Sequence, residues 1–105
     1  MKKAIRQSDL IIPMVGNVHQ KRRPNKNDVN IMLINEYDNP YDKNAIAVYS
    51  RTKDSMTKLG FVIKDKTSQI KNIENQINSI KLIRSAEKVP ETDRYYYYLM
   101  INTDN

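Results

Sequence analysis

Three acidic side chains gather around one segment of the chain that is dense in turn-forming residues. Glu36, Asp38 and Asp42 lie in or beside the segment 38–44, which contains an Asn-Pro pair. Neighbouring carboxylates are able to hold Mg²⁺ or to act as a general acid and base. In turns of this kind, however, an Asp side chain usually accepts hydrogen bonds from its own backbone. We therefore expect a turn here, with no metal and no catalysis.

Few residues of the chain support any other enzyme chemistry. The chain of 105 residues has no Cys and one His, His19, which excludes disulfides, thiol catalysis, Cys-ligated zinc and any multi-His metal site. Neither a P-loop nor a G-x-S-x-G nucleophile motif is present. We predict a protein that is not an enzyme and has no cofactor. No apolar run approaches the roughly 20 residues of a membrane span, so we expect a cytoplasmic protein.

Basic residues are concentrated at the start of the chain. Of 18 Lys+Arg and 12 Asp+Glu, residues 1–26 hold seven basic side chains and one acid, and the remainder is balanced. Much of the excess lies in Lys21, Arg22, Arg23 and Lys26. Such a segment contacts phosphate or is simply a solvated loop, and the composition does not decide between these.

Four consecutive tyrosines, Tyr95 to Tyr98, begin the last apolar segment. On a strand, side chains alternate between the two faces, so Tyr95 and Tyr97 share one face and Tyr96 and Tyr98 the other. One face belongs to the core. The other exposes two tyrosines that would stack on bases or contact a protein partner.

Short apolar segments separated by turns predict the elements that position these residues. We expect strands over 10–15, 29–37, 45–49 and 59–63, with Pro13 favouring an edge or a bulge. Ile70, Ile73, Ile77 and Ile80 follow a helical spacing, which predicts a helix over 67–79. Segments 81–84 and 95–101 read as a hairpin. The prediction is a mainly β (α+β) fold: a flexible basic lead-in over 1–8, then a single domain over 9–105 forming a small OB-like or SH3-like antiparallel β-barrel with one accessory helix.

The turn and its flanks resemble the HIRAN domain family, a module found in fork-remodelling ATPases and alone in bacteria and phages. The family's core phrase is a Leu, an acid, and then N-P-Y-D-x-N-A-I-x-V. This chain matches it with Leu33, Glu36 and Asn39-Pro40-Tyr41-Asp42-Lys43-Asn44-Ala45-Ile46-Ala47-Val48. Val15-Gly16 and Leu59-Gly60-Phe61 match further family positions, so the resemblance spans residues 10–80.

The resemblance implies binding of single-stranded DNA, particularly a free 3′ end, in a pocket lined by the turn. Carried over, Asn39, Tyr41 and Asp42 would surround the terminal nucleotide. Relatives carry an Arg-aromatic pair after Val-Gly, where this chain has Val18 and His19. The charge would then come from Lys21, Arg22, Arg23 and Lys43, and Phe61 would stack. These nine residues form the predicted DNA-binding site: His19, Lys21, Arg22, Arg23, Asn39, Tyr41, Asp42, Lys43 and Phe61.

Two other interpretations of the same residues stay open. Asn39, Asp42 and Asn44 would only close a hairpin, with Tyr41 covering the end of the barrel. Alternatively, the chain is a protein-interaction module of phage or mobile-element origin that contacts a host nucleic-acid enzyme through Tyr96 and Tyr98. The leading expectation is a non-catalytic module that binds single-stranded DNA, accessory to repair or replication.

Overall fold

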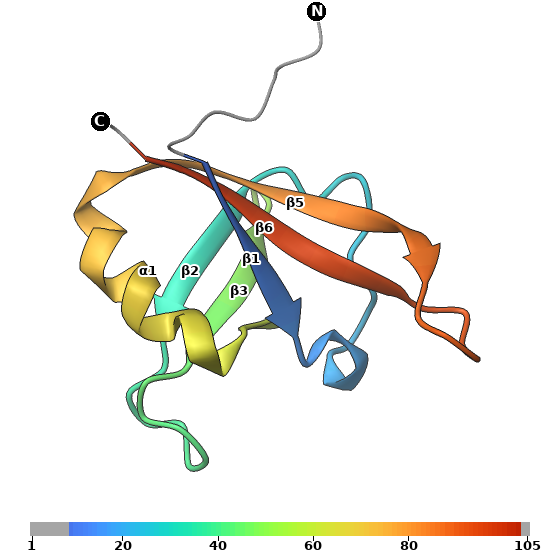
Figure 1. The fold of residues 1–105 in the computed structure, drawn as a ribbon, viewed down its shortest axis with the longest axis horizontal. Helices are drawn as coiled ribbons and strands as arrows, with labels where there is room; N and C mark the ends of the chain where they lie inside the picture. Colours follow the sequence, from blue (N-terminus) through green and yellow to red (C-terminus); the bar gives the residue numbers. More distant parts are fainter. Residues whose placement is uncertain (1–8, 104–105) are drawn as a thin grey trace, which may run out of the picture.

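The structure is a computed structural model that describes residues 9–103, and the predicted lead-in over 1–8 lies outside the described residues. Six strands, one α-helix and three short 3₁₀ segments follow in the order β1 (Asp9–Val15), η1 (Asn17–His19), β2 (Ile31–Asn35), β3 (Ile46–Arg51), β4 (Met56–Val62), η2 (Lys64–Lys66), α1 (Thr67–Ile73), η3 (Glu74–Gln76), β5 (Ile77–Lys88) and β6 (Tyr95–Thr103) (Figure 1). Every predicted strand is present, with ends that differ by a few residues.

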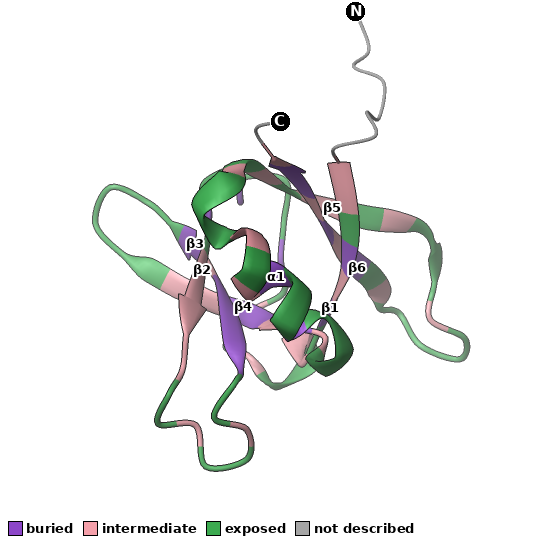
Figure 2. Ribbon diagram, turned by 60° about the vertical axis from the view of Figure 1, so that its left-hand side comes forward, coloured by how far each residue is buried: buried purple, intermediate pink, exposed green. Residues whose placement is uncertain are grey.

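All strand pairs are antiparallel, in the order β2-β3-β4-β1-β6-β5. This confirms the mainly β fold with one accessory helix. The barrel itself is not closed, because β2 and β5 are the two edges of the sheet and no ladder joins them within residues 9–103. Figure 2 shows α1 lying between β2–β4 on one side and β1, β6 and β5 on the other. Ile70 of this helix is buried in the core, so the helix fills the opening that a closed barrel would not have.

The core lies on the inner face of the curved sheet and follows the period of two. Val48, Leu59, Leu99 and Ile101 are fully buried, and Ile12 is nearly so. Tyr97 is also buried and Tyr95 packs against the same cluster, whereas Tyr96 is exposed. The predicted division of the four tyrosines between the two faces is therefore confirmed.

The predicted helix over 67–79 is too long. Only Ile70 and Ile73 of the helical stripe lie in α1, whereas Ile77 and Ile80 belong to β5. All four isoleucines still contact one core cluster. The helical spacing of the isoleucines gave a wrong prediction because β5 pairs with β6 over most of its length, with a register shift between Ile77 and Ser79. These main-chain hydrogen bonds outweigh a weak helix preference.

Pro13 lies in an interior strand, contrary to the edge position that its chemistry favours. β1 pairs with β6 along six residues but with β4 only at Met14 and Val15. The N and O atoms of one strand residue point to the same side, and the Pro13 carbonyl accepts from the Ile63 N–H just after β4 ends. The backbone N–H that Pro13 lacks would therefore have pointed toward β4, at the end of the β1–β4 ladder. Its absence costs the sheet few hydrogen bonds.

Candidate nucleic-acid interface

The side chain of Asn39 determines the shape of the turn that joins β2 to β3. Its Oδ1 accepts hydrogen bonds from the backbone N–H groups of Tyr41 and Asp42 at 2.9 and 3.0 Å. Its Nδ2 donates to Glu36 Oε1 at 3.1 Å. Both ends of the amide are thus occupied within the turn. Asn39 therefore positions its neighbours, and its contact with a nucleotide stays a prediction.

Tyr41 projects from this turn and is 94% exposed. It does not cover the end of the barrel, so that interpretation is wrong for this residue. Asp42 is half-buried, and its Oδ1 accepts from the Asn44 N–H at 2.9 Å, as the hairpin-closing interpretation predicted. No hydrogen bond within residues 9–103 engages Asp42 Oδ2. The turn therefore leaves the Tyr41 ring exposed and Asp42 Oδ2 without a hydrogen-bond partner among the described residues.

A shallow hollow of about 410–430 Å³ accompanies each of two separate groups of predicted residues. The hollow at the turn is lined by residues 37–43, which include Asp38, Asp42 and Lys43 and so carry no excess of positive charge. The hollow beside the basic segment includes Lys21, Arg22 and Arg23, and it shares no residue with the first. In Figures 1 and 2 the turn stands well apart from the β5–β6 hairpin that borders the second hollow. The nine residues of the predicted DNA-binding site therefore do not line one continuous hollow.

The three acids of the turn region do not converge on one point. Glu36 forms an ion pair with Lys58 of β4 and accepts from Asn39. The hydrogen bond from Lys58 lowers the pKa of the Glu36 carboxyl despite its partial burial, and the same contact raises the pKa of Lys58. Within residues 9–103, no group of three or more His, Cys, Asp or Glu side chains could hold a metal ion.

Lys58 lies between two aromatic rings on the outer face of the sheet. Its Nζ is 5.0 Å from the centre of the Phe61 ring and 5.8 Å from that of Tyr49. Both distances are within the range of cation–π attraction. Tyr49 is paired with Lys58 and with Met32, so these side chains share one face. The sequence analysis did not select Lys58 or Tyr49. Simple alternation would place Lys58 and Phe61, three residues apart on β4, on opposite faces, and the register shift between Val48 and Tyr49 brings them to the same one.

Phe61 connects this outer face to the short helix η1. A Cβ atom on Gly16 would lie only 3.2 Å from the Phe61 ring, so the ring packs directly over the glycine. Gly16 has φ of 74°, a left-handed conformation that turns the chain from β1 into η1. His19 at the end of η1 is exposed. Glu36, Lys58, Phe61 and Gly16 are thus in contact one after the other, from the turn to η1, which ends at His19.

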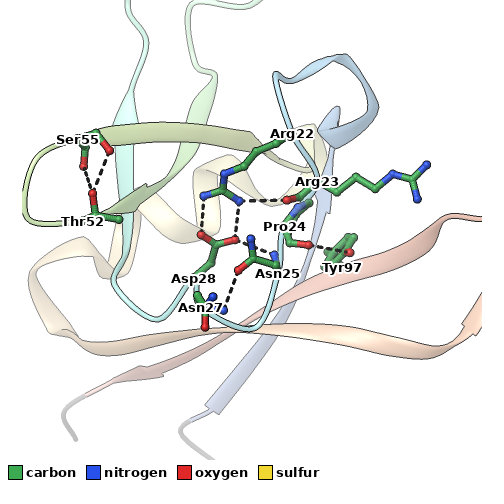
Figure 3. A network of polar contacts seen from close by, with 9 residues as sticks. All are labelled: Arg22, Arg23, Pro24, Asn25, Asn27, Asp28, Thr52, Ser55 and Tyr97. Atoms are coloured by element: carbon green, nitrogen blue, oxygen red, sulfur yellow. Dashed lines mark hydrogen bonds and ion pairs between the residues drawn. The ribbon is translucent and has the colours of Figure 1, made fainter.

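Arg22, one of the predicted phosphate contacts, is engaged inside the protein. Its guanidinium donates to both oxygens of Asp28, at 2.8 and 2.9 Å (Figure 3). Burial raises the pKa of the Asp28 carboxyl, but hydrogen bonds from Arg22, Ser50 and the Asn25 N–H together lower it from 3.8 to about 2. A buried charge held by this many donors anchors the loop that precedes β2. We therefore leave Arg22 out of the set of residues that bind a ligand.

Arg23 extends in the opposite direction from Arg22 in Figure 3. It donates to Asp93, in the β5–β6 hairpin, at 3.1 and 3.2 Å. The two side chains remain 62% and 73% exposed. Lys21 is exposed as well. Arg23 is more exposed than Arg22, whose side chain is 36% exposed and paired with Asp28.

Comparison of the chain with protein-family models, with curated proteins and with solved structures finds no match. Within residues 9–103, no helix is both long enough and apolar enough to cross a membrane.

Proposed function

We propose that this chain is a non-catalytic, cytoplasmic module that binds single-stranded DNA through the turn and the adjoining outer face of β3 and β4. The observation that carries the proposal is the 94% exposure of Tyr41 on a turn held rigid by Asn39. An aromatic ring presented on a fixed backbone loses little conformational entropy when a base stacks on it. The resemblance of this turn to the HIRAN family points to the same ligand.

Each side chain in this region suits a different part of a DNA end. The face of Tyr41 stacks on a base, an interaction of about 1–3 kcal/mol. Asp42 Oδ2 accepts from a 3′-hydroxyl group and repels a 3′-phosphate. Lys43 and Lys58 offer positive charge to the DNA backbone. Phe61, Tyr49 and His19 offer further aromatic rings between the turn and η1.

A fluorescence-polarisation titration with oligonucleotides ending in a 3′-hydroxyl or a 3′-phosphate tests the proposal. Tyr41→Ala should weaken binding of the 3′-hydroxyl strand about tenfold, since the ring on which one base stacks is removed. Asp42→Asn should reduce the preference for the 3′-hydroxyl, because the amide no longer repels phosphate.

Tyr96→Ala is the matched control for this experiment. Tyr96 is also exposed, at 46%, but it lies on β6 and does not line the hollow at the turn. Its removal should leave the affinity within about twofold. Equal, weak binding of both oligonucleotides that survives Tyr41→Ala and Asp42→Asn would refute end recognition.

A second candidate function is favoured by the outer face of β1 and β6. Tyr96 is 46% exposed, Tyr98 is half-buried, and Ile11 pairs with Met100 on the same face. This apolar area would contact a host or phage nucleic-acid enzyme. If neither oligonucleotide binds at all, protein docking through Tyr96 and Tyr98 replaces DNA binding as the leading function.

A further inference from the structure

A second cleft, of about 410 Å³, lies where the basic segment meets the β5–β6 hairpin. The cleft shares no residue with the hollow that Tyr41 lines, and its walls come from parts of the chain some 70 residues apart. The buried Tyr97 hydroxyl donates to the Pro24 carbonyl at 3.4 Å (Figure 3). Arg23 donates to Asp93, so the two walls are joined by direct contacts.

Positive charge dominates the lining of this cleft. Its charged side chains are one acid, Asp93, and five cations: Lys21, Arg22, Arg23, Arg84 and Arg94. Even with Arg22 neutralised by Asp28, four cations face one carboxylate. Such an excess in a concave surface attracts anions, because the low-dielectric walls concentrate the field. The sequence analysis did not select Arg84 or Arg94, which the hairpin brings beside Lys21 and Arg23.

Two of these cations are already oriented for a planar or anionic ligand. The Arg84 guanidinium lies 4.3 Å from the centre of the Tyr95 ring, which restricts its side-chain freedom. Arg23 is paired with Asp93, which also lines the cleft. Because that pair is well exposed, it contributes little to folding and is readily exchanged. A phosphate group offers Arg23 a partner of the same bidentate geometry.

We propose that this cleft binds backbone phosphates of a nucleic acid, with Arg23 moving from Asp93 to a phosphate while Arg84 and Arg94 contact the same or the next one. That the ligand is a nucleic acid rests on the proposed function, whereas the existence of an anion site does not. Asp93 then keeps Arg23 extended until a phosphate binds, and it competes with that phosphate for Arg23.

Titration with inorganic tripolyphosphate, followed by amide chemical shifts in NMR, tests the site without any base or 3′ end. Shifts should concentrate at residues 21–23 and 93–95 and be absent at Asn39 and at residues 41–43. Asp93→Asn should tighten binding at least threefold, because it removes the competing carboxylate. Arg84→Gln combined with Arg94→Gln should weaken binding about tenfold.

Arg51→Gln is the matched control, since Arg51 is an exposed arginine that lines a different hollow. Its affinity for tripolyphosphate should equal that of the unaltered protein. Unchanged or weaker binding in Asp93→Asn, or shifts spread over all exposed cations, would overturn the proposal. Folding of each variant is checked by its NMR spectrum, so that a failure to bind is not confused with a failure to fold.

Oligonucleotide titrations separate this inference from the proposed function. If the cleft binds backbone phosphates, the Arg84→Gln, Arg94→Gln variant should flatten the plot of log affinity against log salt, by about 0.7 for each phosphate that is no longer neutralised. Tyr41→Ala should leave that slope, and tripolyphosphate binding, unchanged. Tripolyphosphate binding without DNA binding would refute the proposed function and the nucleic-acid ligand while the anion site stands. DNA binding with an unchanged slope would refute the role of the cleft and leave the proposed function standing.

Discussion

Arg22 and Arg23 are adjacent in the chain, and each forms an ion pair with an aspartate. The difference is the environment of the partner: the Asp28 side chain is 3% exposed, whereas that of Asp93 is 73% exposed. Removing Arg22 leaves a buried carboxylate without its main donor, whereas removing Arg23 leaves a carboxylate that water solvates. Chemically equivalent residues therefore have different structural importance.

Chemical denaturation should reveal this difference directly. We expect Arg22→Ala to lower the free energy of unfolding by about 2 kcal/mol or more and Arg23→Ala by less than about 1 kcal/mol. Urea unfolding monitored by tyrosine fluorescence measures both. Equal losses in the two variants would contradict the structural role assigned to Arg22.

At the scale of elements, the contact between β1 and β4 depends on a glycine. A Cβ atom on Gly60 would lie 2.6 Å from the backbone oxygen of Val15 and 3.3 Å from Met14. A backbone oxygen cannot rotate away as a side chain can, so the two strands would have to separate. They are joined at only two register positions, which makes this ladder sensitive to such a shift.

Gly60→Ala should therefore destabilise the protein more than Gly16→Ala. We expect a loss of about 2–3 kcal/mol at Gly60, from overpacking against backbone. At Gly16 the left-handed backbone costs about 1 kcal/mol, and the nearest atom belongs to the Phe61 side chain. Melting temperatures of the two variants compare the effects. A larger drop for Gly16→Ala would mean that β1 and β4 separate easily.

The free energy of unfolding of the whole molecule depends on pH through the buried carboxylate of Asp28. The pKa of Asp28 is about 2 in the folded chain against an ordinary value of 3.8. The folded state therefore holds the proton less tightly than the unfolded state. The stabilisation is fully present above about pH 4 and is lost as the pH falls through 2.

Unfolding free energies measured between pH 5 and pH 2 should show this loss. We expect Asp28 to account for about 2 kcal/mol of the decrease, a part that disappears from the curve of Asp28→Asn. Asp54→Asn, in the exposed turn between β3 and β4, should keep the original curve. If Asp28→Asn retains the full pH dependence, the charge on Asp28 is not what stabilises the loop before β2.

The period of two, together with the turn residues, determined the strands, the antiparallel class and the outward face of the tyrosine segment. These properties depend on neighbours within a few residues, so a local pattern is enough to predict them. The same holds for Asn39 and Asp42, which bond backbone groups within three positions of themselves.

Only the tertiary structure decided which charges are free to bind a ligand and where they meet. Asp28 takes up Arg22, while a hairpin some 70 residues away supplies Arg84, Arg94 and Asp93 to the cleft beside Arg23. The end of α1 was decided in the same way, because β6 pairs with the residues that would have continued the helix. Pairings between distant segments follow from how the sheet curves around the core, and no local pattern of residues contains that information.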